Sequence, residues 1–191
     1  MPGTRLVEPA VVNGICLAEH GSRPVRFKPR YLRGKFARKH YIPFHNPRLS
    51  QAEELKEKIK DMYFDIIISS PLIRAKHTAE IIAKNREIFY DDRIKERSCG
   101  SLSGQPLEVT NREEYWNYYT TIQYGTSENI QEFFKRVYNF LDELKTKDYK
   151  SVLIVAHSGV SKAFNGYFEG IQDGKFLNRG LKNCEIKEYE L

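Results

Sequence analysis

Val152-Leu153-Ile154-Val155-Ala156-His157-Ser158-Gly159 is the stretch of the sequence that decides the fold. A short apolar run that is bounded by Ser or Gly is typical of a buried strand in a parallel sheet. Ligands of open α/β sheets bind outside the carboxyl ends of such strands. The stretch therefore predicts a strand over 151–156 that delivers His157 to the edge of the sheet where a ligand binds.

A second apolar run, near the amino end, has the same form. Ile15-Cys16-Leu17-Ala18 leads to Glu19, His20 and Gly21. We expect His20 to face the same crevice as His157, although about 140 residues separate the two along the chain. For either histidine alone, a hydrogen-bonded residue of the core is the alternative interpretation.

A third run, Ile66-Ile67-Ile68, is followed by Ser70, Pro71 and Arg74. Serine is a favoured N-cap and proline a favoured first helical residue, so the pattern predicts a helix over 71–84. Arg74 in its first turn would add a cation to the anion site that a helix N-terminus already offers. An ordinary solvated arginine is the alternative interpretation for Arg74 alone.

Strand and helix patterns alternate along most of the chain. Ser50-Gln51-Ala52-Glu53 has the form of a capping box, and apolar residues recur at helical spacing between 130 and 144. We predict an α/β protein, a three-layer α/β/α sandwich around a mainly parallel central sheet. Residues 1–14 are expected to be an amino-terminal extension, and residues 15–191 a single domain.

Composition excludes several classes of protein. The 191 residues are 40% hydrophobic and 13% aromatic, which is typical of neither a disordered nor a membrane-spanning chain. The sequence has no apolar stretch of 18 residues and no signal-peptide pattern, so we expect a cytoplasmic protein without a membrane partner. Its three cysteines are widely spaced, and no metal-ligand spacing is present, so neither a disulfide framework nor a metal site is expected.

The net charge of +6 is concentrated near the amino end. Eight Lys or Arg residues lie between Arg23 and Lys39 with no acidic residue among them, and Phe27, Tyr31 and Phe36 are interleaved with them. Three interpretations stay open: a nucleic-acid surface, a charged funnel for a phosphorylated small molecule, and a solvated loop. Nucleic acid is the less favoured partner.

The order of the motifs resembles the histidine phosphatase superfamily, also called phosphoglycerate mutase-like. Three segments carry the resemblance: Ser70-Pro71-Leu72-Ile73-Arg74-Ala75-Lys76-His77-Thr78-Ala79, Glu96-Arg97-Ser98-Cys99-Gly100-Ser101-Leu102-Ser103-Gly104, and Ala156-His157-Ser158-Gly159. The agreement in order and spacing extends over about residues 42–191. The resemblance implies a phosphoglycerate mutase-like fold and an enzyme that moves phosphoryl groups.

The resemblance also implies a role for each site residue. His20 would attack phosphorus and form a phosphohistidine, and Glu96 would be the general acid. Arg74 and His157 would hold the phosphoryl oxygens and stabilise the transition state. Gly21, Ser22, Arg23, Arg26 and Ser158 would contribute to substrate binding, and no cofactor or metal is implied.

One departure from the family pattern affects the chemistry. The family has an arginine before the first histidine, whereas this chain has Glu19. Loss of a charged donor and repulsion between a carboxylate and the phosphoryl group each cost about 3 kcal/mol of transition-state stabilisation. Three hypotheses follow: a phosphomonoesterase for a small phosphorylated metabolite with activity weakened by Glu19, an impaired family member that binds RNA or another polyanion through its basic loop, and a mutase of the phosphoglycerate type.

Overall fold

The apolar run Val152–Ala156 forms the middle strand of a five-stranded sheet in the computed structural model, which describes residues 10–13 and 46–191. The strands are β1 (Ala10–Asn13), β2 (Ile66–Ser69), β3 (Phe89–Tyr90), β4 (Val152–Ala156) and β5 (Ile186–Glu188). They lie in the order β3-β2-β4-β1-β5, and only β1 and β5 pair antiparallel. The mainly parallel sheet predicted from the sequence is confirmed.

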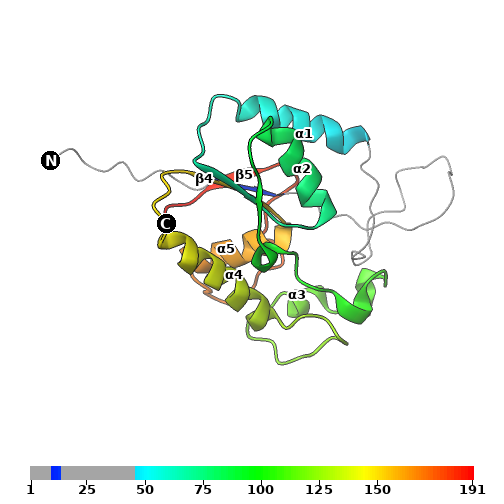
Figure 1. The fold of residues 1–191 in the computed structure, drawn as a ribbon. Coiled ribbons are helices and arrows are strands. Elements are labelled where there is room, and N and C mark those ends of the chain that lie inside the picture. The colour runs from blue at the N-terminus through cyan, green and yellow to red at the C-terminus, as the bar shows by residue number, and fades with distance from the viewer. Residues whose placement is uncertain (1–9, 14–45) are drawn as a thin grey trace.

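Helices cover both faces of this sheet (Figure 1). They are α1 (Asn46–Lys58), α2 (Ile73–Ala83), α3 (Arg112–Tyr115), α4 (Ile130–Lys145) and α5 (Ser158–Glu169), with short 3₁₀ helices η2 (Asp92–Ile94), η3 (Gly100–Leu102) and η4 (Leu107–Val109). α1 and α2 pack on one face, and α4 and α5 pack on the other. The predicted three-layer α/β/α sandwich is therefore confirmed.

β4 supplies both hydrophobic cores because successive side chains of a strand point to opposite faces. Leu153 and Val155 pack among residues of α1 and α2, whereas Ile154 and Ala156 pack among residues of α4 and α5. All five residues of β4 are buried. A strand that is buried on both faces must be apolar throughout, which explains the continuous run.

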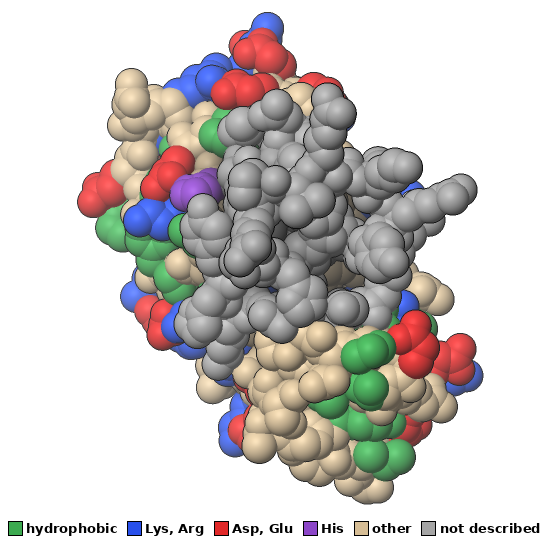
Figure 2. All heavy atoms as spheres, turned by 90° about the vertical axis from the view of Figure 1, so that its right-hand side faces the viewer, with side chains coloured by type: hydrophobic (Ala, Val, Ile, Leu, Met, Phe, Trp, Pro, Cys, Tyr) green, Lys and Arg blue, Asp and Glu red, His purple; other side chains and the backbone are tan. Residues whose placement is uncertain are grey.

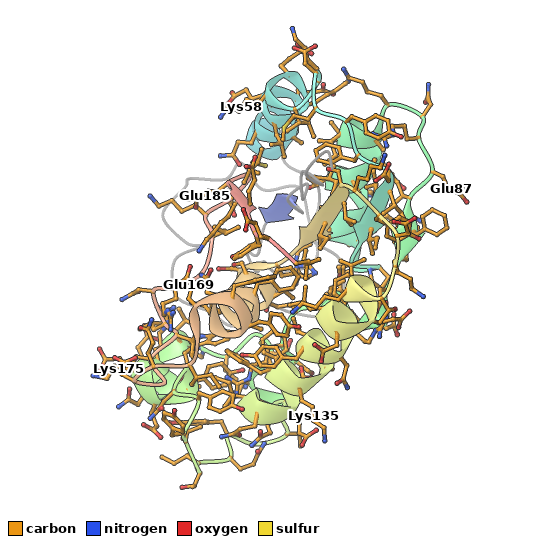
Figure 3. All side chains as sticks on the ribbon, turned by 90° about the vertical axis from the view of Figure 1, so that its left-hand side faces the viewer. Lys58, Glu87, Lys135, Glu169, Lys175 and Glu185 are labelled. Atoms are coloured by element: carbon orange, nitrogen blue, oxygen red, sulfur yellow. The ribbon has the colours of Figure 1, made fainter. Side chains whose placement is uncertain are left out.

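α4 has the amphipathic pattern that the sequence indicates. The side chain of Asn129 caps the helix, because its Oδ1 accepts hydrogen bonds from the backbone N–H groups of Gln131 and Glu132. Seven apolar residues of α4 are buried, as predicted: Ile130, Phe133, Phe134, Val137, Phe140, Leu141 and Leu144. Charged side chains such as Lys135, Lys58 and Glu169 project outward from the helices in Figure 3.

The amino end differs from the prediction. We expected residues 1–14 to be an extension, but Ala10–Asn13 form β1 and pair with β4 on one side and β5 on the other. Ala10, Val11 and Val12 form an apolar run of only three residues, which explains why its sequence signal is weak. The strand expected over 15–20 lies outside the described residues.

Two helix starts also differ. α1 begins at Asn46, so Ser50 lies inside the helix and the capping-box interpretation is wrong. α2 begins at Ile73, with Leu72 at the cap position, two residues later than predicted. Ser70 is not the cap, because its hydroxyl oxygen accepts a hydrogen bond from Leu72 N–H (3.3 Å) in a tight turn and also contacts His157.

Within residues 10–13 and 46–191, none of the helices has both the length and the apolar character that a bilayer crossing requires.

Candidate functional site

The carboxyl ends of β2 and β4 bring Ser70 and His157 together. The two strands are parallel neighbours, and Ser70 N–H donates to the carbonyl oxygen of Val155 (2.9 Å). His157 Nε2 and Ser70 Oγ are 2.7 Å apart, which is a hydrogen bond between two fully buried side chains. Ser70 thus fixes the orientation of the imidazole ring, as expected for a histidine that has to present one ring edge to a ligand.

Arg74 lies in the first turn of α2 and is almost completely buried, with 7% of its surface exposed. Its Nε has no hydrogen-bond partner among the residues that the structure describes. A buried guanidinium nitrogen without a partner is costly, and an anion that accepts from it would remove that cost. The solvated arginine considered from the sequence is therefore wrong, and the position fits a bound phosphoryl group.

Glu96 follows η2 and reaches the start of α5. Its Oε1 accepts from the backbone N–H of Arg97 (2.9 Å), and its Oε2 accepts from that of Gly159 (3.2 Å). A Cβ atom at position 159 would lie 2.0 Å from Glu96 Oε1 and 3.0 Å from Trp116 Cη2. The glycine of the His157-Ser158-Gly159 segment therefore leaves the space that the Glu96 carboxylate occupies in this position.

Arg74 and Glu96 line the same cavity, which has a volume of about 370 Å³. Its wall also includes Ser98, Cys99, Glu128 and Arg136. Burial raises the pKa of the Cys99 thiol to about 11, so this thiol is protonated at neutral pH and is a poor nucleophile. Among the described residues, the ionisable side chains of the wall are thus four cations and three carboxyl groups, with one protonated thiol: Arg74, Lys95, Arg97, Arg136, Asp92, Glu96, Glu128 and Cys99.

His157 is fully buried and is not among the described residues that line this cavity, but hydrogen bonds of its neighbours connect it to the segments of Arg74 and Glu96. Ser70, which holds the imidazole, lies four residues before Arg74, and Gly159, which holds Glu96, lies two residues after His157. The structure thus brings Arg74, Glu96 and His157 to one edge of the sheet. The hydroxyl of Ser158 donates to the carbonyl oxygen of Leu181 (3.2 Å), and its predicted role in substrate binding stays a prediction.

The other predicted site residues, His20, Gly21, Ser22, Arg23 and Arg26, lie outside the described residues, as does Glu19. The register of the sheet shows at which edge β1 ends. Asn13, the last residue of β1, pairs with Ala156, the last residue of β4. The chain therefore leaves β1 at the edge that carries His157, seven residues before His20.

Sequence reasoning gave no indication of the cavity residues Glu128 and Arg136, nor of Lys162, a buried cation near the cavity whose charge acts on Glu96. Lys162 lies on α5 with its Nζ 4.9 Å from the centre of the Trp116 ring, and Nζ donates to the carbonyl oxygens of Phe176 (2.5 Å) and Leu177. Burial lowers the pKa of Lys162 to about 8, although the charge of Glu96 opposes the shift. A single lysine within a helix gives no sequence signal of such burial.

A model of one protein family matches residues 32–191, and it is described as "Histidine phosphatase superfamily (branch 1)". The chain belongs to the histidine phosphatase superfamily. The match begins beyond His20, so it includes Arg74, Glu96 and His157 and leaves the role of His20 a prediction.

Related proteins carry the names of phosphatases. This superfamily member is 33% identical over 184 residues to "Uncharacterized phosphatase PhoE" of Bacillus subtilis, which covers 93% of this chain and 90% of that protein. It is 29% identical over 143 residues to phosphoserine phosphatase 1 of Hydrogenobacter thermophilus, covering 70% of this chain and 68% of the relative.

Solved structures show the same fold. The crystal structure of the alpha-ribazole phosphatase from Shigella flexneri superposes with a TM-score of 0.76 at 19% sequence identity, over 97% of this chain and 91% of that one. The phosphoglycerate mutase-like fold predicted from the resemblance is therefore confirmed.

Proposed function

We propose that the protein is a phosphomonoesterase that hydrolyses a small phosphorylated metabolite through a phosphohistidine on His20. The observation that carries the proposal is the buried Arg74 guanidinium, whose Nε lacks a partner among the described residues, beside Glu96 in one cavity. A phosphoryl oxygen can accept from Nε, and the carboxyl group of Glu96 can serve the ester oxygen. Membership of the superfamily supports this assignment of roles.

The reaction has two steps in this proposal. A ring nitrogen of His20 forms a bond to phosphorus while the bond between phosphorus and the ester oxygen breaks, and Glu96 gives its proton to the departing oxygen. Water then attacks the phosphohistidine and gives a proton to Glu96, which releases inorganic phosphate and restores His20. Arg74 and His157 hold the phosphoryl oxygens through both steps.

The size of the cavity supports a small substrate. A volume of about 370 Å³ is at the lower end of the range for small-molecule sites, so a phosphoryl group with a compact leaving group fills it. The hydroxyl groups of Ser98 and Thr126 and the ion pair of Glu128 with Arg136 line its wall. These groups suit a polar leaving group, such as a hydroxylated or amino-bearing alcohol.

The distribution of charge favours this function over binding of a polyanion by the described part of the chain. Residues 51–191 contain 21 Lys or Arg and 23 Asp or Glu, a net charge of −2. On the face shown in Figure 2, acidic and basic side chains alternate on the coloured surface and form no field of a single sign. An RNA-binding surface needs clustered positive charge.

The proposal is tested by measuring phosphate release from p-nitrophenyl phosphate and from small alkyl phosphates. We expect His20→Ala to abolish turnover, and Arg74→Ala to lower kcat/KM at least a hundredfold through loss of a charged donor. Lys76→Ala, an exposed cation on the same helix, is the matched control and should retain the wild-type rate.

Three results would contradict the proposal. Equal rates for the wild type and His20→Ala would exclude the phosphohistidine. Isomerisation of a phosphoglycerate without release of phosphate would show a mutase. Salt-sensitive RNA binding without any release of phosphate would show a polyanion-binding protein.

A further inference from the structure

We propose that Arg136 and Glu128 are positioning residues that hold Glu96 in place for proton transfer. They would thereby determine how well the enzyme hydrolyses esters with poor leaving groups. The inference rests on the proposed function, because that function makes Glu96 the general acid.

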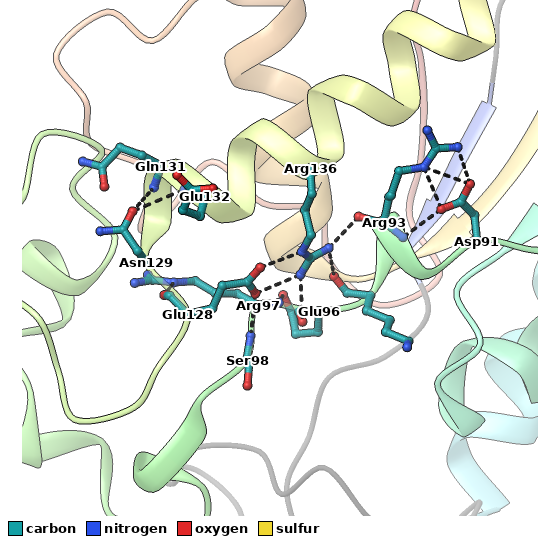
Figure 4. Close-up of polar contacts among 11 residues, drawn as sticks. Asp91, Arg93, Glu96, Arg97, Ser98, Glu128, Asn129, Gln131, Glu132 and Arg136 are labelled. Carbon is teal, nitrogen blue, oxygen red and sulfur yellow. Dashed lines mark hydrogen bonds and ion pairs between the residues drawn. The ribbon is translucent and has the colours of Figure 1, made fainter.

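Arg136 joins α4 to the backbone that carries Glu96 (Figure 4). Its Nη1 donates to the carbonyl oxygens of Arg93 (2.5 Å) and Lys95 (2.9 Å), and its Nη2 donates to that of Glu96 (3.3 Å). The remaining donors of the guanidinium, Nε and Nη2, reach the Glu128 carboxylate at 2.6 and 2.9 Å. These contacts use all five N–H groups of the side chain, so it has one well-defined position.

Glu128 holds the residues that follow Glu96. Its Oε2 accepts from the backbone N–H of Ser98 (2.9 Å), and its own N–H donates to the Ser98 carbonyl oxygen (2.8 Å). Nε of the buried Arg97 donates to the carbonyl oxygen of Glu128 (2.8 Å). Arg136 therefore fixes the backbone up to Glu96, and Glu128 fixes the backbone just after it.

The pair connects an irregular segment to the rigid core. Residues 95–99 belong to no helix or strand, so no regular backbone ladder determines the position of Glu96. The Arg136 guanidinium lies 4.7 Å from the centre of the Phe133 ring, and Phe133 is fully buried in the core. Arg136 and Glu128 also line the cavity beside Glu96, and each has about a quarter or less of its side chain exposed.

The ion pair could instead contribute only to stability, and the leaving group distinguishes the two roles. A general acid matters most when the departing oxygen is strongly basic, as in an alkyl phosphate, and least when it is weakly basic, as in p-nitrophenyl phosphate. A variant that misplaces Glu96 should therefore lose much more kcat/KM on an alkyl ester than on an aryl ester. A variant that only destabilises the protein should lose the same fraction on both.

The experiment measures kcat/KM of full-length variants on glycerol phosphate and p-nitrophenyl phosphate. We expect Arg136→Gln to lower the alkyl-to-aryl ratio at least tenfold, because a displacement of about 1 Å in a catalytic group costs up to a hundredfold. Glu128→Gln keeps the shape of the side chain and should lower the ratio in the same direction. It also provides the test if Arg136→Gln does not fold.

Glu143→Gln is the matched control. Glu143 accepts from Arg93 Nη1 at 2.8 Å, so this ion pair also joins α4 to the segment before Glu96, but it does not reach the cavity wall. The control variant should retain the wild-type ratio. Arg136→Lys keeps the charge without the planar fork and should restore the ratio only in part.

A second test combines each substitution with Glu96→Gln. If Arg136 acts through Glu96, adding Arg136→Gln to Glu96→Gln should leave the ratio unchanged, because the positioned group is already absent. Equal losses on both substrates, or a further fall of the ratio in the Glu96→Gln background, would overturn the inference and leave the proposed function intact. Absence of phosphate release by the wild type would overturn the proposed function itself.

Discussion

Replacing Gly159 by alanine should displace the Glu96 carboxylate while the fold persists. The added Cβ would lie 2.0 Å from Glu96 Oε1, so the oxygen must withdraw by about 1 Å to reach an allowed contact. The carboxylate is the end of a flexible side chain, which can rotate away, whereas the Trp116 ring, 3.0 Å from the added Cβ, must shift by a few tenths of an ångström. We therefore expect the free energy of unfolding to fall by about 1–2 kcal/mol.

The same displacement should be costly for catalysis. Moving a catalytic group by about 1 Å lowers a rate by about a hundredfold, and general acid catalysis contributes about 10² to 10⁴ in total. We expect Gly159→Ala to lower kcat about a hundredfold on an alkyl phosphate and less than tenfold on p-nitrophenyl phosphate. Steady-state phosphate release at several pH values, together with thermal unfolding, measures both effects.

Gly166→Ala is the control for this prediction, because it is the same substitution on the same helix. A Cβ at position 166 would meet Tyr138 Oη at 2.7 Å and Phe134 Cε1 at 2.9 Å, and neither residue lines the cavity that contains Glu96. That variant should lose stability while its preference between the two substrates stays unchanged. If Gly159→Ala keeps the wild-type rate on alkyl phosphates, the contact with Glu96 is not part of the catalytic geometry and the reasoning is refuted.

Three further predictions concern single residues. Glu19→Arg should raise kcat/KM at least tenfold, which corresponds to about 1.4 kcal/mol, and an unchanged rate would show that this carboxylate does not affect the phosphoryl group. Ser70→Ala removes the hydrogen bond to buried His157, so chemical denaturation should show a loss of about 1–3 kcal/mol, and a loss below 0.5 kcal/mol would contradict the structure. Lys162 has a pKa lowered to about 8, so between that pH and its ordinary pKa the unfolded chain binds more protons and the contribution of Lys162 to stability rises with pH. The unfolding free energy of the wild type minus that of Lys162→Met should therefore become more positive from pH 8 to pH 10. A difference that does not change with pH would contradict the lowered pKa.

The helices and strands that could be predicted from the sequence are those whose spacing of apolar residues follows directly from which side chains are buried. The seven buried apolar residues of α4 and the continuous apolar run of β4 follow directly from the periodicity of a helix and of a strand between two helical layers. The convergence of Arg74 and His157 followed as well, because the carboxyl ends of parallel strands meet at one edge of a sheet.

Local signals failed where a tertiary contact competes with them. Ser70 looks like a helix cap in the sequence, but its hydroxyl contacts His157, 87 residues further along the chain. The Ser50–Glu53 segment has the form of a capping box, but α1 already begins at Asn46, four residues before Ser50. β1 was missed because strand pairing on both sides stabilises it more than its own short apolar run indicates.

The contacts that position Glu96 could not be predicted from the sequence. Arg136 donates to backbone carbonyl oxygens of residues 40 or more positions earlier in the chain. Every residue has a backbone carbonyl group, so the sequence does not show which of them accept from a distant side chain. Gly159 was recognised only as part of a motif, and its physical requirement became clear from its distance to the Glu96 carboxylate.

The most direct test of the central claim is to trap the phosphoenzyme. The protein is mixed with a ³²P-labelled phosphomonoester that it hydrolyses, the reaction is stopped in alkali after a few milliseconds, and the labelled peptide is identified. We predict a label that is stable in alkali and lost in acid, as a phosphohistidine is, in the peptide that contains His20, and no such label in His20→Ala. Turnover without label on the protein, or label on a residue other than His20, would contradict the account.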